Sequence, residues 1–268
     1  MEDALLAAGL GMAQPCRSLL NQALKSALGP AVGIAITDVR GDPTSLWPSE
    51  AEAVRAAVPR RRAEFAAGRA AARQALQALG QPAQALPMAP DRSPVWPAGF
   101  VGSIAHNAHV CVALVGERKR VHALGVDVEA DGPLGAELWP IVCRPEEQAW
   151  LRERAPQDQG RWALRFFCAK EAFYKWQYPK SQRMLDFQDV SIVFAADGLT
   201  FDVRWAGSSD DGKQLPLVTG RSIAADGLWL SWLIGPGNAT LAPSVREPMA
   251  THATAKGDSR VTHGATNP

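Results

Sequence analysis

The stretch Leu124-Gly125-Val126-Asp127-Val128-Glu129 alternates aliphatic residues with glycine and two acids, a pattern typical of a β-strand with one buried face. Such a strand sends its aliphatic side chains to one side and both carboxylates to the other, with the carboxylates roughly 6 to 7 Å apart. Like charges at this spacing repel, and a hard divalent cation such as Mg²⁺ removes the repulsion by taking oxygen ligands from both. A solvated acidic face would give the same pattern, so this stretch alone leaves both interpretations open.

The chain around this strand mixes further strands with long helices. Alternating apolar residues predict strands at residues 32–36, 110–114, 190–194, 200–205, 217–223 and 228–234. Helical patterns predict two long helices, at residues 60–79 and 161–176, the second ending before Pro179. Because helices and short strands do not alternate regularly along the chain, the pattern favours an α+β fold.

The second predicted helix has two different faces. Its apolar stripe is typical of a core face and consists of Trp162, Phe166, Ala169, Phe173 and Trp176. Glu171 and Lys175 project from nearly the opposite side, at the i, i+4 spacing of a simple surface ion pair. However, Leu164 and Phe167 lie near them, which indicates that this face also packs against another part of the chain. Glu171 there could be a third metal ligand, with Lys170 and Lys175 as cations for phosphate oxygens.

The first predicted helix is rich in arginine. Arg62, Arg69 and Arg73 fall on one helical stripe, with Arg61 beside it. Guanidinium groups match the geometry of phosphate, so the stripe is a candidate phosphate site, although a solvated cationic face would look the same. His106 precedes the strand predicted at residue 110, and we expect it in a loop.

The composition limits the classes of partner. The 268 residues carry 28 Lys+Arg against 27 Asp+Glu, and this near-neutral balance argues against nucleic-acid binding through a diffuse positive field. The longest apolar runs, at residues 110–115 and 228–234, are far shorter than the roughly 20 residues needed to cross a bilayer. The start Met1-Glu2-Asp3 lacks the basic and apolar parts of a secretory signal. We therefore expect a cytoplasmic protein that binds neither nucleic acid nor membrane.

Five blocks of sequence occur together in an order that is specific to one family. They are RRAEFAAGR at 61–69, WP at 96–97, GSIAH at 102–106, GVDVE at 125–129 and FCAKEAFYK at 167–175. With these blocks the chain resembles the surfactin/enterobactin-type 4′-phosphopantetheinyl transferases. The FFCAKE form of the last block and the Trp-Pro pair are more similar to the enterobactin-like branch.

The resemblance implies a fold and a domain organisation. It implies two similar α+β subdomains related by a pseudo-twofold axis, each a small sheet packed with a long helix, in a monomer. We place the N-terminal subdomain at residues 1–120 and the C-terminal one at 121–235. Residues 236–268, which contain few apolar side chains, are predicted to be a disordered tail.

The resemblance also implies the roles of individual residues around coenzyme A and Mg²⁺ in the cleft between the subdomains. Asp127, Glu129 and Glu171 would hold Mg²⁺, and Glu171 would also act as the base. Lys170 and Lys175 would contact the pyrophosphate and the leaving group. The nucleotide part, mainly its 3′-phosphate, would be held by Arg61, Arg69, Arg92, Ser103 and His106, although helical register does not choose between Arg61 and Arg62. Where many members of the family have Ser or Thr before the histidine, this chain has Ala105, which predicts weaker binding of coenzyme A.

The reaction implied is attack by a serine hydroxyl of an apo acyl, peptidyl or aryl carrier protein on the β-phosphate of coenzyme A. Because the nucleophile belongs to the partner, the enzyme needs no catalytic Ser or Cys of its own. Two other functions remain open. One is a catalytically silent homologue that binds carrier proteins, and the other is a different Mg²⁺-dependent phosphoester enzyme that uses water in place of serine.

Overall fold

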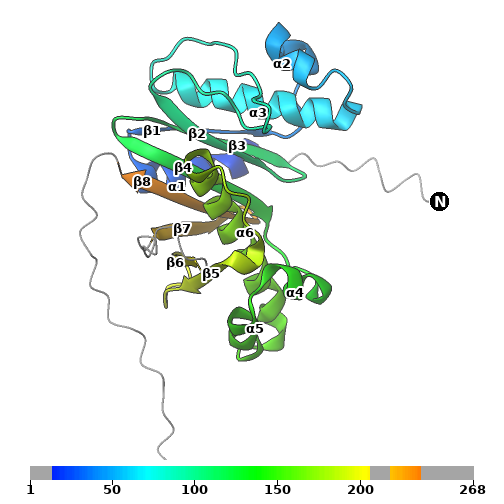
Figure 1. Cartoon of the computed structure of the whole chain (residues 1–268), viewed down its shortest axis with the longest axis vertical. Coiled ribbons are helices and arrows are strands. Elements are labelled where there is room, and N and C mark those ends of the chain that lie inside the picture. The colour runs from blue at the N-terminus through cyan, green and yellow to red at the C-terminus, as the bar shows by residue number, and fades with distance from the viewer. Residues whose placement is uncertain (1–13, 206–217, 237–268) are drawn as a thin grey trace, which may run out of the picture.

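The protein is built from two antiparallel sheets and two long helices (Figure 1). The computed structural model describes residues 14–205 and 218–236. The first sheet has the strand order β1-β3-β2, with β1 at Val32–Asp38, β2 at Phe100–His106 and β3 at Val110–Glu117. The second has the order β4-β8-β7-β6-β5, with β4 at Val121–Ala130, β5 at Val190–Phe194, β6 at Thr200–Trp205, β7 at Val218–Ala225 and β8 at Leu228–Pro236. The α+β fold class is therefore confirmed.

The helices frame these sheets. The α-helices are α1 at Gln14–Leu28, α2 at Pro48–Ala53, α3 at Pro59–Gln77, α4 at Trp139–Val142, α5 at Pro145–Arg152 and α6 at Pro156–Ser181. Short 3-10 turns are η1 at Pro43–Ser45, η2 at Ala136–Leu138 and η3 at Phe187–Asp189. Within residues 14–205 and 218–236, no helix combines the length and the apolar character needed to cross a membrane.

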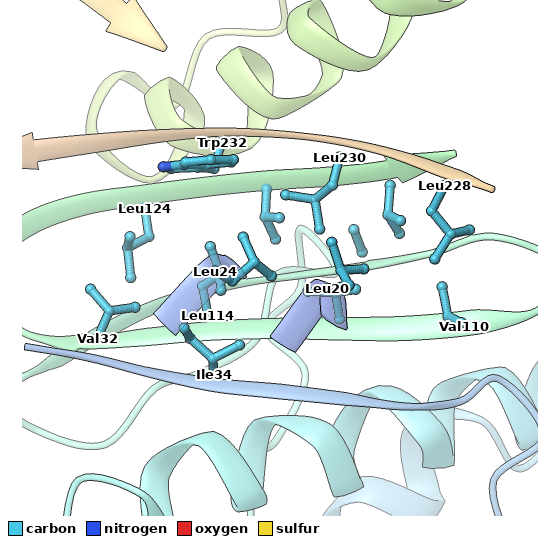
Figure 2. Packing of buried hydrophobic residues seen from close by; sticks show 14 of the residues in the cluster. Leu20, Leu24, Val32, Ile34, Val110, Leu114, Leu124, Leu228, Leu230 and Trp232 are labelled. Atoms are coloured by element: carbon cyan, nitrogen blue, oxygen red, sulfur yellow. The ribbon is translucent and has the colours of Figure 1, made fainter. Parts of the chain in front are cut away.

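The central core lies between the two sheets. Val32 and Ile34 of β1 pack in one cluster with Leu124 of β4 and Leu230 of β8, so the inner faces of both sheets meet there (Figure 2). Helix α1 adds Leu20 and Leu24, both fully buried, to the same cluster. Burying this apolar area is the main favourable contribution to folding, at about 25 cal/mol per Å².

Each long helix covers the outer face of one sheet. Helix α3 packs its alanine-rich side, including Ala71 and Ala75, on the first sheet, and α6 packs Phe166 and Phe173 on the second. Both contacts use a strand glycine where the helix backbone comes close. A Cβ atom at Gly33 would overlap the carbonyl oxygen of Ala75 in α3. A Cβ atom at Gly125 would likewise overlap the Ala172 carbonyl oxygen and would lie 2.6 Å from the backbone nitrogen of Trp176.

Two predictions about local structure are wrong. Helix α6 begins at Pro156, before Gly160, and continues through Pro179 to Ser181. A proline there removes only one hydrogen bond of the last turn, and Gln182 ends the helix with a left-handed φ of 54°. His106 is the last residue of strand β2, because pairing with β3 holds residues 100–106 extended despite their weak strand pattern.

The other predicted elements are present, and two expectations about the division of the chain stay predictions. The predicted strands correspond to β1 and β3 to β8, and the two predicted helices to α3 and α6. The subdomain boundary at residue 120 and the pseudo-twofold relation remain predictions. The tail predicted at residues 236–268 lies, beyond position 236, outside the described residues.

Replacing Gly125 by alanine should destabilise the protein, because the added Cβ would push α6 away from β4. We expect Gly125→Ala to lower the free energy of unfolding by about 1–3 kcal/mol or more, measured by urea denaturation. Gly132→Ala is the control, since the nearest atom to an added Cβ there is 3.9 Å away. Equal stability of the two variants would contradict a close helix-to-strand contact at Gly125.

Candidate functional site

A partly buried ion pair joins α6 to β4 at the centre of the candidate site. The face of β4 opposite the central core carries Gly125 and Asp127, and α6 lies against it. The Lys175 ammonium donates a hydrogen bond of 2.6 Å to Oδ1 of Asp127. Asp127 is only 5% exposed, and its second carboxylate oxygen, Oδ2, is buried without a hydrogen-bond partner in the structure. An unpartnered buried carboxylate oxygen is suited to a cation.

Two more carboxylates share this environment. Burial raises the pKa of Glu129 to about 7, and the neighbouring charges of Asp127 and Glu171 act in the same direction. Burial also raises the pKa of Glu171, against the opposing charge of Lys175. Burial alone would lower the pKa of Lys175, but the charge and hydrogen bond of Asp127 raise it. The Lys175 ammonium therefore bonds to Asp127 and acts electrostatically on Glu129 and Glu171, so the three carboxylates carry an excess of negative charge when they are ionised.

This group of oxygens fits Mg²⁺. In the described part of the chain, no three His, Cys, Asp or Glu side chains are already gathered as a complete metal cage. Mg²⁺ does not need such a cage, because it commonly takes one or two protein carboxylates together with waters and substrate phosphates. The Oδ2 oxygen of Asp127, which is buried without a hydrogen-bond partner, is available as a ligand for such a cation.

Helix α3 contributes a buried guanidinium group. Arg69 is 4% exposed, and its guanidinium lies 4.1 Å from the centre of the Phe65 ring. Its Nε and Nη2 atoms have no hydrogen-bond partner in the structure. Burial lowers the pKa of Arg69 to about 10, so it is still charged at neutral pH. Buried donors without partners are costly, and an anion such as a phosphate would satisfy them.

Arg61 and His106 form a second basic pair. Nη1 of Arg61 lies 3.4 Å from Nε2 of His106, which joins α3 to the end of β2. Desolvation lowers the pKa of His106, so its neutral ring can accept this contact. Arg62 instead donates to the carbonyl oxygen of Ala57 at 2.8 Å. Arg61, and not Arg62, is therefore the arginine that lies beside His106.

The arginines of the predicted stripe differ in their hydrogen-bond partners. Arg73, which the sequence placed with Arg62 and Arg69, donates to both carboxylate oxygens of Glu50 at 2.8 Å. Glu50 is fully buried and also accepts from the backbone of Leu86. Arg73 therefore belongs to the core of the first half, and Arg69 is left as the buried arginine with free donors.

A cavity of about 360 Å³ opens between the first sheet and α6. Its walls come from both halves of the chain and include Arg92, Trp96, Ser103, Tyr174, Lys175 and Tyr178. Arg92 has a positive φ of 69° at the edge of this cavity. The aromatic walls and basic rim suit a flat, anionic ligand such as a nucleotide. Trp96, Tyr174 and Tyr178 were not predicted as lining residues, although Tyr174 and Tyr178 repeat at i, i+4 beside Lys175.

Three predicted positions have surroundings that differ from the expectation. The structure does not bring Lys170 to the carboxylates, because its ammonium is buried among other acceptors, including Glu147 at 2.6 Å. Ser103 lines the cavity, but its hydroxyl already accepts a 3.1 Å hydrogen bond from the backbone of Val126. Ala105 is 3% exposed and packs in the central core, so a serine hydroxyl there would face apolar side chains. The expected loss of a phosphate contact at this position has no support in the geometry.

In the metal-free protein, the raised pKa of Glu129 should make the free energy of unfolding depend on pH. Because the folded-state pKa is about 7 against an ordinary value of 4.5, wild-type stability falls as pH rises from 4.5 through 7. A glutamine cannot ionise, so Glu129→Gln should be more stable than wild type by about 1–3 kcal/mol at pH 8. The difference should vanish near pH 4, below the ordinary pKa of the carboxyl group.

Thermal unfolding in the presence of a chelator measures this difference. Glu153→Gln removes an exposed carboxylate near the end of α5 and is the control. The same pH dependence in both variants would show that Glu129 ionises as an ordinary surface carboxylate.

Comparisons with known proteins connect both halves of this site to one family. A family model described as the 4′-phosphopantetheinyl transferase N-terminal domain matches residues 49–116. A second, described as the 4′-phosphopantetheinyl transferase superfamily, matches residues 123–211. The first region contains Arg61, Arg69 and His106, and the second contains Asp127 and Lys175.

Individual relatives agree with these matches. The chain is 36% identical over 221 residues to the 4′-phosphopantetheinyl transferase Svp of Streptomyces mobaraensis, covering 81% of this chain and 86% of the relative. It is 33% identical over 209 residues to the 4′-phosphopantetheinyl transferase PptT of Mycobacterium tuberculosis, covering 75% and 92%. It is also 36% identical over 133 residues to enterobactin synthase component D of Salmonella typhi, covering 48% and 54%. The chain belongs to the 4′-phosphopantetheinyl transferase superfamily.

Proposed function

We propose that the protein transfers the 4′-phosphopantetheine group of coenzyme A to a serine of an apo carrier protein, with Mg²⁺, and releases adenosine 3′,5′-bisphosphate. The observation that carries this proposal is that a carboxylate oxygen and two guanidinium nitrogens are buried without a hydrogen-bond partner. The carboxylate is that of Asp127, which is bonded to Lys175 on the cavity wall, and the guanidinium is that of Arg69 on α3. A substrate with two separate phosphate groups, one of them bound to metal, matches this arrangement.

The basic residues of the first half would hold the nucleotide. Arg69 has free donors for the 3′-phosphate, and the Arg61–His106 pair lies on the same helix and its adjoining strand. Arg92 and the aromatic walls of the cavity would hold the remaining part of the nucleotide. Binding by several preformed contacts fixes the pyrophosphate relative to the carboxylates, and such positioning is a main source of rate in phosphoryl transfer.

The residues of the second half would carry out the transfer. Asp127, Glu129 and Glu171 would hold Mg²⁺, which supplies Lewis-acid stabilisation of the pyrophosphate charge. The carrier's serine oxygen forms a bond to the β-phosphorus as the bond to the bridging pyrophosphate oxygen breaks. Glu171 accepts the serine proton as the general base. Lys175, which lines the cavity beside Asp127, would neutralise charge on the departing bisphosphate.

Lys170 is not assigned a contact with the substrate, because its ammonium group is bonded to other acceptors. Of the two lysines predicted to contact the pyrophosphate, we assign only Lys175 to it.

We further propose a monomeric, cytoplasmic enzyme. The FCAKEAFYK block and the partial match to enterobactin synthase component D support a carrier from siderophore or other secondary metabolism.

Transfer is tested directly by the mass of the carrier. We expect a panel of apo acyl and peptidyl carrier proteins to include at least one that gains a single phosphopantetheine when incubated with the protein, coenzyme A and Mg²⁺. A chelator should abolish the gain. Coenzyme A binding without transfer to any carrier would favour a silent homologue, and hydrolysis of coenzyme A without a carrier would favour the water-using enzyme.

Arg69→Met should weaken coenzyme A binding, because it removes a charged donor from a buried phosphate site. The loss of one or two charge-assisted hydrogen bonds, about 1.5–3 kcal/mol, predicts a roughly 10- to 150-fold higher KM for coenzyme A. Steady-state kinetics and calorimetric titration with adenosine 3′,5′-bisphosphate measure the change. Arg62→Met is the matched control on the same helix, since Arg62 is exposed and bonds to Ala57. Equal effects at both arginines would point to general electrostatics in place of a specific phosphate contact.

A further inference from the structure

Lys170 lies one residue before Glu171 on α6, yet its side chain turns away from the cleft into a polar pocket. The ammonium group donates three hydrogen bonds. They reach the carbonyl oxygen of Val142 at 2.8 Å, Oε2 of Glu147 at 2.6 Å and the carbonyl oxygen of Phe187 at 2.9 Å. An ammonium group has three protons, so Lys170 has no donor left for a substrate.

Glu147 is satisfied just as completely. Besides Lys170, its Oε2 accepts from the backbone of Arg144 at 2.8 Å, and its Oε1 accepts from the backbone of Ile192 at 2.7 Å. The side chains of Lys170 and Glu147 are each 2% exposed. The pair therefore connects α6 to the end of α4, to α5, to η3 and to β5. Of these elements, α4 and α5 lie near the lower end of α6 in Figure 1.

The Lys170–Glu147 pair lies next to Glu171 along α6 and can therefore affect the direction of the Glu171 side chain. Residues 170 and 171 project about 100° apart on a helix, so holding Lys170 on the α4–α5 side sets the direction in which Glu171 leaves the helix. Lys175 holds the helix again, slightly more than one turn later, at Asp127 on β4. Glu171 lies between the two attachments. A buried ion pair adds little net stability compared with apolar packing, whereas its hydrogen bonds are directional.

We propose that Lys170 and Glu147 are a positioning pair, which orients α6 so that the Glu171 carboxylate faces Asp127 and Glu129, and that neither residue touches the substrate. This inference rests on the proposed function for the role of Glu171 in transfer. A positioning role and a substrate-contact role of Lys170 predict different results for Glu147. If the pair positions α6, replacing the buried Glu147 should weaken metal binding and turnover as much as replacing Lys170.

Three variants test the pair. Lys170→Met and Glu147→Gln each break it, and the double variant Lys170→Met/Glu147→Met removes both charges without leaving one of them buried alone. Leu151→Ala is the control, because Leu151 is a fully buried apolar residue on the same helix, α5, and its truncation destabilises without touching the polar contacts. Circular dichroism and thermal unfolding first establish that each variant is folded at the assay temperature.

The main measurement is Mn²⁺ binding, followed by electron paramagnetic resonance of the free ion, with transfer kinetics beside it. We expect the pair variants to bind Mn²⁺ and to turn over about 10- to 100-fold more weakly, the range found for residues that orient metal ligands. Their affinity for adenosine 3′,5′-bisphosphate should stay within about twofold of wild type, since Arg69 is unchanged. Leu151→Ala should lose stability but keep its Mn²⁺ affinity.

Two results would overturn the inference. A folded double variant with wild-type Mn²⁺ affinity would show that the pair does not orient Glu171. A higher KM for coenzyme A in Lys170→Met with normal kinetics in Glu147→Gln would show that Lys170 contacts the substrate. Failure of wild-type protein to modify any carrier would count against the proposed function, and the Mn²⁺ comparison would still decide the role of the pair.

Discussion

The close approach of α6 to β4 at Gly125 is the contact on which the site depends. Without a side chain at this position, the helix backbone at Ala172 and Trp176 rests directly on the strand. This brings Lys175 within 2.6 Å of Asp127 and places Glu171 in the same electrostatic environment as Glu129. A larger residue at position 125 would separate the helix from the strand, and the carboxylates would no longer act on one ligand.

The same contact creates an electrostatic problem that the protein solves only in part. Burial is the main cause of the raised pKa values of Glu129 and Glu171, and repulsion from the neighbouring carboxylates adds to it. Lys175 offsets one charge by bonding Oδ1 of Asp127 and leaves Oδ2 buried and free. On α3, Arg69 has the opposite problem, because two of its guanidinium nitrogens are buried without a hydrogen-bond partner. A metal-bound diphosphate nucleotide would resolve both at once.

Patterns with a short period predicted much of this arrangement. The alternation in residues 124–129 correctly separated the aliphatic face of β4 from the face of Asp127, because a strand has only two sides. Helical periodicity likewise found the apolar stripe of α6. Strand β2 was missed because its extended form depends on pairing with β3, and Pro179 did not end α6 because a proline in the last turn removes little. Neither cause can be read from local sequence.

The site residues were harder to assign than the elements, and Lys170 shows why. Helical register gives the direction in which the side chain of residue 170 points. It does not predict that Val142, Glu147 and Phe187 supply three hydrogen-bond acceptors there. Arg73 is the same case on α3, where a buried Glu50 takes up the guanidinium. On α6 the basic motif therefore contains Lys175, which lines the cavity, and Lys170, which holds the helix in place. On α3, Arg69 keeps free donors while Arg73 is bound to Glu50. Family motifs can combine binding and positioning residues in a single run, and only the three-dimensional partners separate the two.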